Sequence, residues 1–125
     1  MPENADRGGI LVVEDEFLIA SELAERLATF GFVQIHVAHN VTRGLAYLRD
    51  TPIQFAILDV NIGRDQVFPV ARELATKSIP FIFCTGTPKS EMPLEWSSYP
   101  ILPKPLNDVQ FAKAMRDLLS PPEET

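Results

Sequence analysis

Five polar residues of this chain directly follow short apolar runs, and their types suit chemistry on a phosphoryl group. They are Glu14, Asp15, Asp59, Thr85 and Lys104. Three carboxylates in one pocket would repel one another and need a cation, and hard oxygen ligands suit Mg²⁺. Asp59 could then act as a nucleophile toward phosphorus, while Lys104 and Thr85 supply a positive charge and a hydroxyl for the phosphoryl oxygens. This interpretation requires a fold that brings the five residues together.

Each residue also has an ordinary structural interpretation. Asp59 could begin a loop or cap a helix, and the acids at 14–16 could simply favour a helix N-terminus through the helix dipole. Thr85 before a glycine is a common turn, and Lys104 between two prolines is a common surface lysine. The chemical interpretation therefore depends on all five residues occurring together at strand ends.

Short apolar runs predict the strands. The run at 53–62 is rich in Ile, Phe, Leu and Val without alternation, which indicates a strand buried on both faces, with Asp59 where it ends. Similar buried strands are expected at 10–13 and 79–84, with a brief one at 100–102. The run at 34–38 alternates polar and apolar residues, which is typical of a half-exposed edge strand.

Helical spacing of apolar residues separates these runs. It predicts helices over 17–30 and 41–49, a third from about Gln66 to Lys77, and a last one opened by Asn107. Asn40 is a plausible N-cap of the second helix, as Asn107 is of the last. The proline-rich stretch 88–100 has little periodicity, so a fourth helix there would be short or distorted.

Strand and helix thus alternate five times, which predicts an α/β fold with a five-stranded parallel sheet covered by helices on both faces. In such a sheet all the strands end at one edge, where ligands bind in open α/β folds. The five polar residues should therefore converge on one pocket.

The length and composition of the chain limit the class of protein, its partners and its location. The 125 residues allow one domain, and 46% hydrophobic with 22% charged content is that of a globular protein. A net charge of −6 argues against a nucleic-acid partner and favours a cation or a basic protein surface. One cysteine, Cys84, in an apolar run suggests a buried thiol and a reducing compartment. Without a signal-like or membrane-spanning apolar run, we expect a cytoplasmic protein with no membrane partner.

Four segments together resemble the receiver domain of two-component response regulators: ILVVEDE, AILDVNI, FCTG and LPKPL. The resemblance covers nearly the whole chain and implies a flavodoxin-like (βα)5 fold. We expect a receiver domain of the single-domain type over 10–119, a flexible leader over 1–9 and a polar tail over 120–125.

The resemblance implies a role for each site residue. Glu14 and Asp15 would be the acidic pair that holds Mg²⁺ together with Asp59, and Asn61 would contribute its backbone carbonyl to the metal. Asp59 would be phosphorylated by a histidine kinase or a histidine phosphotransfer protein. Thr85 and Lys104 match the switch hydroxyl and the lysine of the family, and the peptide bond from Lys104 to the following proline would be cis.

Departures from the family concern the output. An aromatic residue usually precedes the lysine by about three positions, but Ile101 stands there and Tyr99 lies two residues further back. The segment 80–86 resembles an atypical subgroup with a PFxFATGY-like motif, although Thr87 replaces the tyrosine. In that subgroup the fourth helix is poorly formed. Cys84, Trp96 and His36 are expected to be structural or exposed, and His39 to be a surface residue.

Three functional hypotheses follow. The first is a phospho-accepting receiver that catalyses only its own phosphoryl transfer and dephosphorylation, and signals by contact with another protein as a monomer or weak homodimer. The second is a receiver-like binding module that works without phosphorylation, which the missing aromatic residue would favour. The third, a phosphohydrolase with an aspartyl nucleophile, would want a second carboxylate where Asn61 stands. We therefore do not expect turnover of an external substrate.

Overall fold

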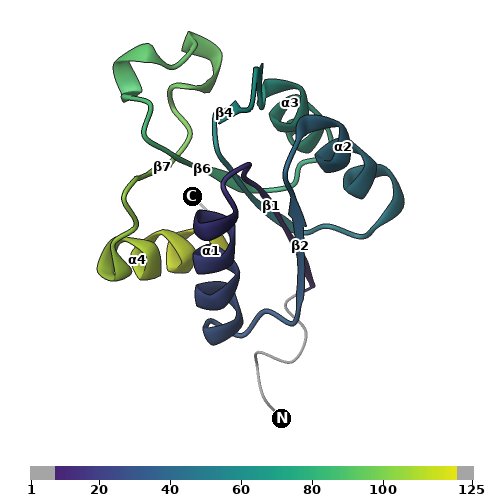
Figure 1. The fold of residues 1–125 in the computed structure, drawn as a ribbon, viewed down its shortest axis with the longest axis vertical. Helices are drawn as coiled ribbons and strands as arrows, with labels where there is room; N and C mark the ends of the chain where they lie inside the picture. The colour runs from purple at the N-terminus through teal and green to yellow at the C-terminus, as the bar shows by residue number, and fades with distance from the viewer. Residues whose placement is uncertain (1–7, 121–125) are drawn as a thin grey trace, which may run out of the picture.

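A sheet of five parallel strands, in the order β2-β1-β3-β6-β7, forms the centre of the computed structural model, which describes residues 8–120 (Figure 1). The strands are β1 (Gly9–Val13), β2 (Gln34–Ala38), β3 (Phe55–Leu58), β6 (Phe81–Thr85) and β7 (Ile101–Pro103). The helices are α1 (Phe17–Thr29), α2 (Val41–Asp50), α3 (Phe68–Thr76) and α4 (Asp108–Leu119). The predicted parallel α/β architecture is therefore confirmed. Most of the predicted leader and tail lies outside the described residues.

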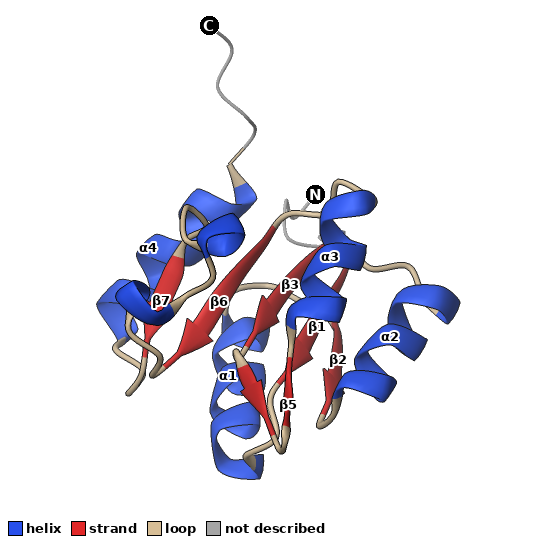
Figure 2. Ribbon diagram, turned by 90° about the horizontal axis from the view of Figure 1, so that it is seen from above, coloured by secondary structure: helices blue, strands red, loops and turns tan. Residues whose placement is uncertain are grey.

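Alternate side chains of the central strands enter two separate cores, because successive residues of a strand point to opposite faces. On one face, Leu58 of β3 packs with residues of α2 and α3 such as Leu48 and Leu74. On the other face, Ile57 packs with residues of α1 and α4 such as Leu27 and Phe111. Figure 2 shows the two helix pairs on opposite sides of the sheet. Burial on both faces explains why the central strands lack polar alternation.

Two asparagines begin helices as predicted. The Asn40 side chain accepts a hydrogen bond of 2.7 Å from the backbone N–H of Arg43, and the Asn107 side chain accepts one of 2.9 Å from that of Gln110. Such caps satisfy N–H groups that have no partner inside the helix. They place the starts of α2 and α4 close behind the ends of β2 and β7.

The chain after β3 differs from the prediction. The central strand ends at Leu58, directly before Asp59 as predicted, but a short antiparallel hairpin of β4 (Asn61–Ile62) and β5 (Asp65–Gln66) follows that was not predicted. Gln66 pairs with Asn61 in this hairpin, so α3 begins at Phe68 and not at Gln66. Pro69 lies in the first turn of α3, where its missing N–H costs no helical hydrogen bond.

The stretch between β6 and β7 contains no α-helix, although all of its residues are described. It forms two single turns of 3₁₀ helix, η2 (Lys89–Glu91) and η3 (Leu94–Trp96). In Figure 1 this green segment extends away from the sheet at the upper left. The Trp96 ring anchors it by packing on Phe68 of α3 and on Phe81 and Phe83 of β6. The expected distortion of a fourth helix is thus confirmed in a stronger form.

No helix within residues 8–120 is both long and apolar enough to cross a bilayer. Cys84 is buried in β6, and its burial raises the pKa of the thiol to about 12, as expected for a structural cysteine.

Candidate functional site

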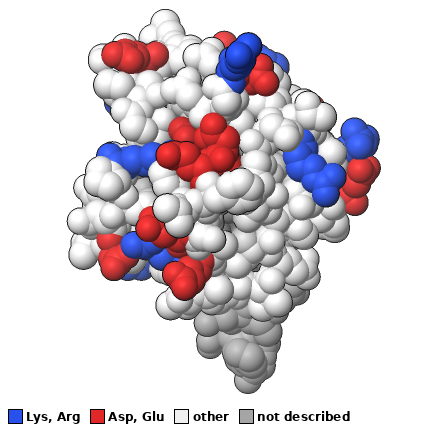
Figure 3. Space-filling model, in the orientation of Figure 1, with Lys and Arg blue, Asp and Glu red and all other residues white. Residues whose placement is uncertain are grey.

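Three carboxylates meet where β1 and β3 end. Glu14 and Asp15 follow β1, and Asp59 follows β3. The backbone N–H of Asp59 donates to the Val13 carbonyl over 2.9 Å, so parallel pairing continues past the end of β3 and aligns the two segments. One oxygen from each carboxylate lies within 4.8 Å of the others. Acidic side chains gather over the β1–α1 loop in Figure 3.

Burial makes two of these acids unusual. Glu14 is 1% exposed and Asp59 is 8% exposed, and few carboxylates are buried so deeply without a charged partner. Lys104 is that partner: its Nζ lies 2.8 Å from Glu14 Oε1 and 2.8 Å from Asp59 Oδ2. The Lys104 backbone N–H donates to the Thr85 carbonyl over 3.2 Å, which ties the lysine to the end of β6. The peptide bond between Lys104 and Pro105 is cis, as the resemblance implied.

The pKa shifts follow from this burial and pairing. Burial raises the pKa of Glu14, and the nearby charge of Asp59 adds to the effect, while the hydrogen bond from Lys104 opposes it. Burial alone would lower the pKa of Lys104, but its hydrogen bonds to Asp59 and Glu14 outweigh burial, so the net shift is upward. Lys104 is therefore a permanent cation at neutral pH, facing two buried acids.

The side chains of Thr85 and Asn61 lie at the same edge of the sheet and are linked there by hydrogen bonds to Thr87. Thr85 is the buried last residue of β6, and its hydroxyl donates to Thr87 Oγ1 over 3.2 Å. Asn61, exposed in β4, donates from its side-chain amide to the same Thr87 Oγ1 over 3.2 Å. All of the predicted site residues thus gather at the carboxyl ends of the strands.

Sequence reasoning missed three residues that hold the carboxylates in place. The Gly63 N–H donates to Asp15 Oδ2 over 2.8 Å, and its φ of +61° suits glycine. His39 Nδ1 lies 3.0 Å from the Glu14 carbonyl, and it must be the donor because a carbonyl only accepts. The Glu16 N–H donates to Glu14 Oε2 over 3.2 Å. The glycine after Ile62 could have signalled a turn, but His39 was expected to be a surface residue and is half-buried.

The donor set fits Mg²⁺. Glu14, Asp15 and Asp59 offer three carboxylate oxygens within 4.8 Å, and the single lysine that contacts the group pairs with only two of the acids. The cluster therefore keeps a net negative charge made of hard oxygen ligands, which Mg²⁺ prefers. These three residues would hold the ion.

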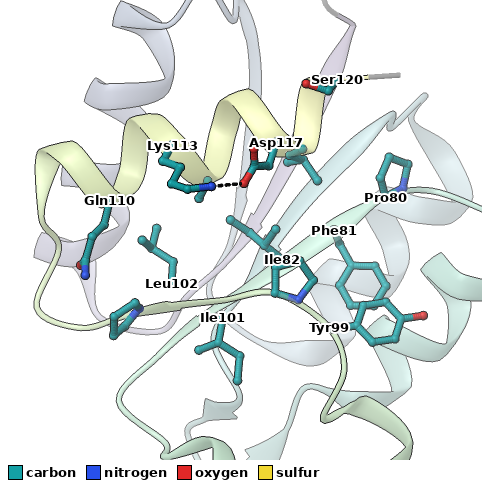
Figure 4. Close-up of a pocket in the computed structure, with 14 residues that line it drawn as sticks. Pro80, Phe81, Ile82, Tyr99, Ile101, Leu102, Gln110, Lys113, Asp117 and Ser120 are labelled. Atoms are coloured by element: carbon teal, nitrogen blue, oxygen red, sulfur yellow. Dashed lines mark hydrogen bonds and ion pairs between the residues drawn. The ribbon is translucent and has the colours of Figure 1, made fainter. Parts of the chain in front are cut away.

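A different hollow lies away from this chemistry. An apolar groove of about 680 Å³ runs between α4 and the edge of the sheet formed by β6 and β7. In Figure 4 the Tyr99 ring lies over the Phe81 ring at one end of the groove, and the Lys113–Asp117 ion pair lies on its helical wall. A smaller hollow of about 510 Å³ lies beside Thr85 and Lys104. Only the smaller hollow borders the candidate site.

A parallel sheet with carboxylates after two central strands, a threonine at the end of the next and a lysine after the last has the layout of a receiver domain. The family model described as the response regulator receiver domain matches residues 10–116, so the chain belongs to this family. Receiver domains of response regulators accept phosphoryl groups, bind Mg²⁺ at an acidic pocket, and interact with histidine kinases or phosphotransfer proteins.

Two solved structures and one curated relative are similar to this chain. The solution structure of SdrG from Sphingomonas melonis Fr1 is 38% identical, with a TM-score of 0.79 over 90% of this chain and 97% of that chain. The BeF3-activated conformation of SdrG from Pseudomonas melonis Fr1 is 37% identical, with a TM-score of 0.78 over 90% and 96%. Regulatory protein VirG from Rhizobium rhizogenes is 27% identical over 112 residues, covering 86% of this chain and 46% of VirG. The chain thus spans about half the length of that curated relative.

Proposed function

We propose that this protein accepts a phosphoryl group on Asp59 from a histidine kinase or a histidine phosphotransfer protein, in a Mg²⁺-dependent reaction, and signals by contact with another protein. The observation that carries the proposal is the position of Asp59 at the end of β3, with Lys104 Nζ 2.8 Å from its carboxylate and two further acids within 4.8 Å. A single buried carboxylate needs only one cation as its partner. This cluster carries more negative charge than Lys104 neutralises, so it also suits a second cation, the metal ion.

The transfer follows from the chemistry of these groups. A carboxylate oxygen of Asp59 attacks phosphorus, the new P–O bond forms as the P–N bond of the phosphohistidine donor breaks, and the imidazole nitrogen takes up a proton. Lys104 is placed to neutralise charge on the phosphoryl oxygens, because it already contacts Asp59. Bound Mg²⁺ would supply the charge neutralisation that lets anionic carboxylate and phosphoryl oxygens approach each other.

Output would begin at Thr85. A phosphoryl group adds acceptor oxygens and negative charge beside the end of β6, so the Thr85 hydroxyl gains a new partner. The segment 86–100 follows directly, and the Trp96 and Tyr99 rings attach it to the core. A changed position of Thr85 would alter this segment, which we propose to be part of the surface read by a downstream protein.

One observation favours a second candidate, a receiver-like module that works without phosphorylation. The position of the usual aromatic residue holds Ile101, and the nearby Tyr99 ring is engaged in a stack on Phe81 with centroids 4.6 Å apart. Ile101 has no ring, and the Tyr99 ring already has a stacking partner in the core. A receiver of this kind could bind partners through a permanent surface.

Incubation with a small phosphoryl donor such as acetyl phosphate separates the two candidates. We expect the intact mass of the wild-type protein to increase by one phosphoryl group in Mg²⁺ and not in EDTA. Asp59→Asn should remain unmodified, because an amide is not a nucleophile of this kind. Asp65→Asn is the matched control: this exposed acid lies in the hairpin six positions later and should label like the wild type.

Labelling of Asp59→Asn to the wild-type level would refute the assignment of Asp59. The complete absence of Mg²⁺-dependent labelling in the wild type would favour the module that works without phosphorylation.

A further inference from the structure

Thr87 stands where the PFxFATGY-like motif, which the segment 80–86 resembles, has tyrosine. The Thr87 hydroxyl lies at the centre of a small hydrogen-bond network. It accepts from Thr85 Oγ1 over 3.2 Å and from Asn61 Nδ2 over 3.2 Å. The backbone N–H of Thr87 in turn donates to Thr85 Oγ1 over 3.2 Å. The network joins the end of β6, the loop after it and the β4–β5 hairpin.

The proton inventory of these hydroxyls decides what the network can do. A threonine hydroxyl has one proton to donate and two lone pairs to accept with. The Thr85 hydroxyl donates its one proton to Thr87 Oγ1. The Thr87 oxygen accepts with both lone pairs, one from Thr85 and one from the Asn61 amide. Thr85 therefore cannot donate to a phosphoryl oxygen on Asp59 until it releases Thr87.

We infer that the Thr87 hydroxyl is a latch that holds Thr85 in the unphosphorylated arrangement and so weakens the response of the site to a phosphoryl group. The inference rests on the proposed function and adds a positioning residue to it. Asn61 supports the latch from the other side, because its amide anchors Thr87 to the hairpin next to Asp59. Thr87 is half-buried, so water competes only partly for these bonds.

Thr87→Val tests the latch, because valine keeps the branched shape and the backbone N–H but cannot accept the Thr85 proton. We expect it to bind beryllofluoride about two- to tenfold more tightly than the wild type in saturating Mg²⁺, the range that one net hydrogen bond supplies. Dissociation constants would come from an NMR titration that follows the backbone amides of Thr85 and Gly86. Thr87→Ala, which also lacks the hydroxyl, should change the affinity in the same direction.

Two comparisons separate a latch from a general packing effect. Thr87→Ser restores a hydroxyl and should bind beryllofluoride like the wild type. In a Thr85→Ala background there is no proton to release, so Thr87→Val should leave the affinity unchanged, and this double-mutant cycle isolates the coupling of the two residues.

The possible outcomes are distinguishable. If the wild type binds no beryllofluoride with Mg²⁺, the proposed function itself fails. If the wild type binds but Thr87→Val and Thr87→Ala bind equally tightly or more weakly, the proposed function stands and the latch is wrong. A gain in affinity that persists in the Thr85→Ala background would also overturn the latch, since it would not act through Thr85.

Discussion

The buried charge of Glu14 shows, for a single residue, that the site is built at a cost to the stability of the fold. Its side chain is almost fully buried and lies close to a second acid, Asp59, while a single lysine serves both. Burial of a charge costs free energy that one partner only partly offsets. An acid kept in such a place is explained by what it binds, and not by what it contributes to the fold.

The raised pKa of Glu14 gives this idea a measurable sign. The unfolded chain loses the Glu14 proton near the ordinary value of 4.5, whereas the folded protein keeps it to higher pH. The folded state then binds more protons in that window, so stability falls as pH rises. We expect the free energy of unfolding of the wild type, minus that of Glu14→Gln, to decrease from pH 4.5 upward until the folded pKa is passed.

Urea denaturation without Mg²⁺ over a series of pH values measures this difference. Glu22→Gln removes an exposed acid from α1 and should show no such dependence. A difference between the wild type and Glu14→Gln that stays flat or increases with pH would show that Lys104, and not burial, controls the ionisation of Glu14.

At the scale of elements, periodicity predicted most of the structure because each central strand is buried on both faces and each helix presents one apolar side. The two N-caps, at Asn40 and Asn107, followed from local chemistry alone. The β4–β5 hairpin was missed because its strands are two residues long, too short for any period to appear. Strand ends predicted the convergence of the site, but not how Gly63 and His39 orient it, since those bonds depend on the folded geometry.

The segment 86–100 is held against the core through the side chain of Trp96. Trp96 is 4% exposed and packs on aromatic rings of β6 and α3, while the Arg72 guanidinium lies over its ring. Trp96→Ala should lower the free energy of unfolding by about 3–5 kcal/mol, because it empties this part of the core. We also expect the segment to become the first site of limited proteolysis.

Leu94→Ala is the matched control in the same turn. Leu94 is 90% exposed, so its truncation should change stability by less than about 0.5 kcal/mol. Equal effects of the two substitutions in chemical denaturation would contradict the anchoring role of Trp96.

At the scale of the whole molecule, the topology gathers residues from distant parts of the chain at one edge of the sheet. A ligand that binds there holds β1, β3 and their loops together and should stabilise the entire fold by mass action. With Mg²⁺ at one hundred times its dissociation constant, the gain is about 2.7 kcal/mol. We therefore expect the thermal midpoint of the wild type to rise on addition of Mg²⁺.

Asp15→Asn should lose most of this gain. Asp15 makes no ion pair with Lys104 in the described structure, so its substitution removes a metal ligand without leaving that lysine unpaired. Glu25→Gln, an exposed change on α1, should keep the full Mg²⁺ effect. An equal shift in Asp15→Asn and the wild type would place the Mg²⁺ site elsewhere.

The most direct test of the central claim is to locate the phosphoryl group itself. Wild-type protein phosphorylated in Mg²⁺ would be treated with borohydride, which reduces an acyl phosphate to an alcohol, and then digested and sequenced by mass spectrometry. We predict reduction at Asp59, giving homoserine at that position and leaving Glu14 and Asp15 unchanged. Reduction at any other carboxylate, or a phosphoryl group that is not an acyl phosphate, would contradict the assignment.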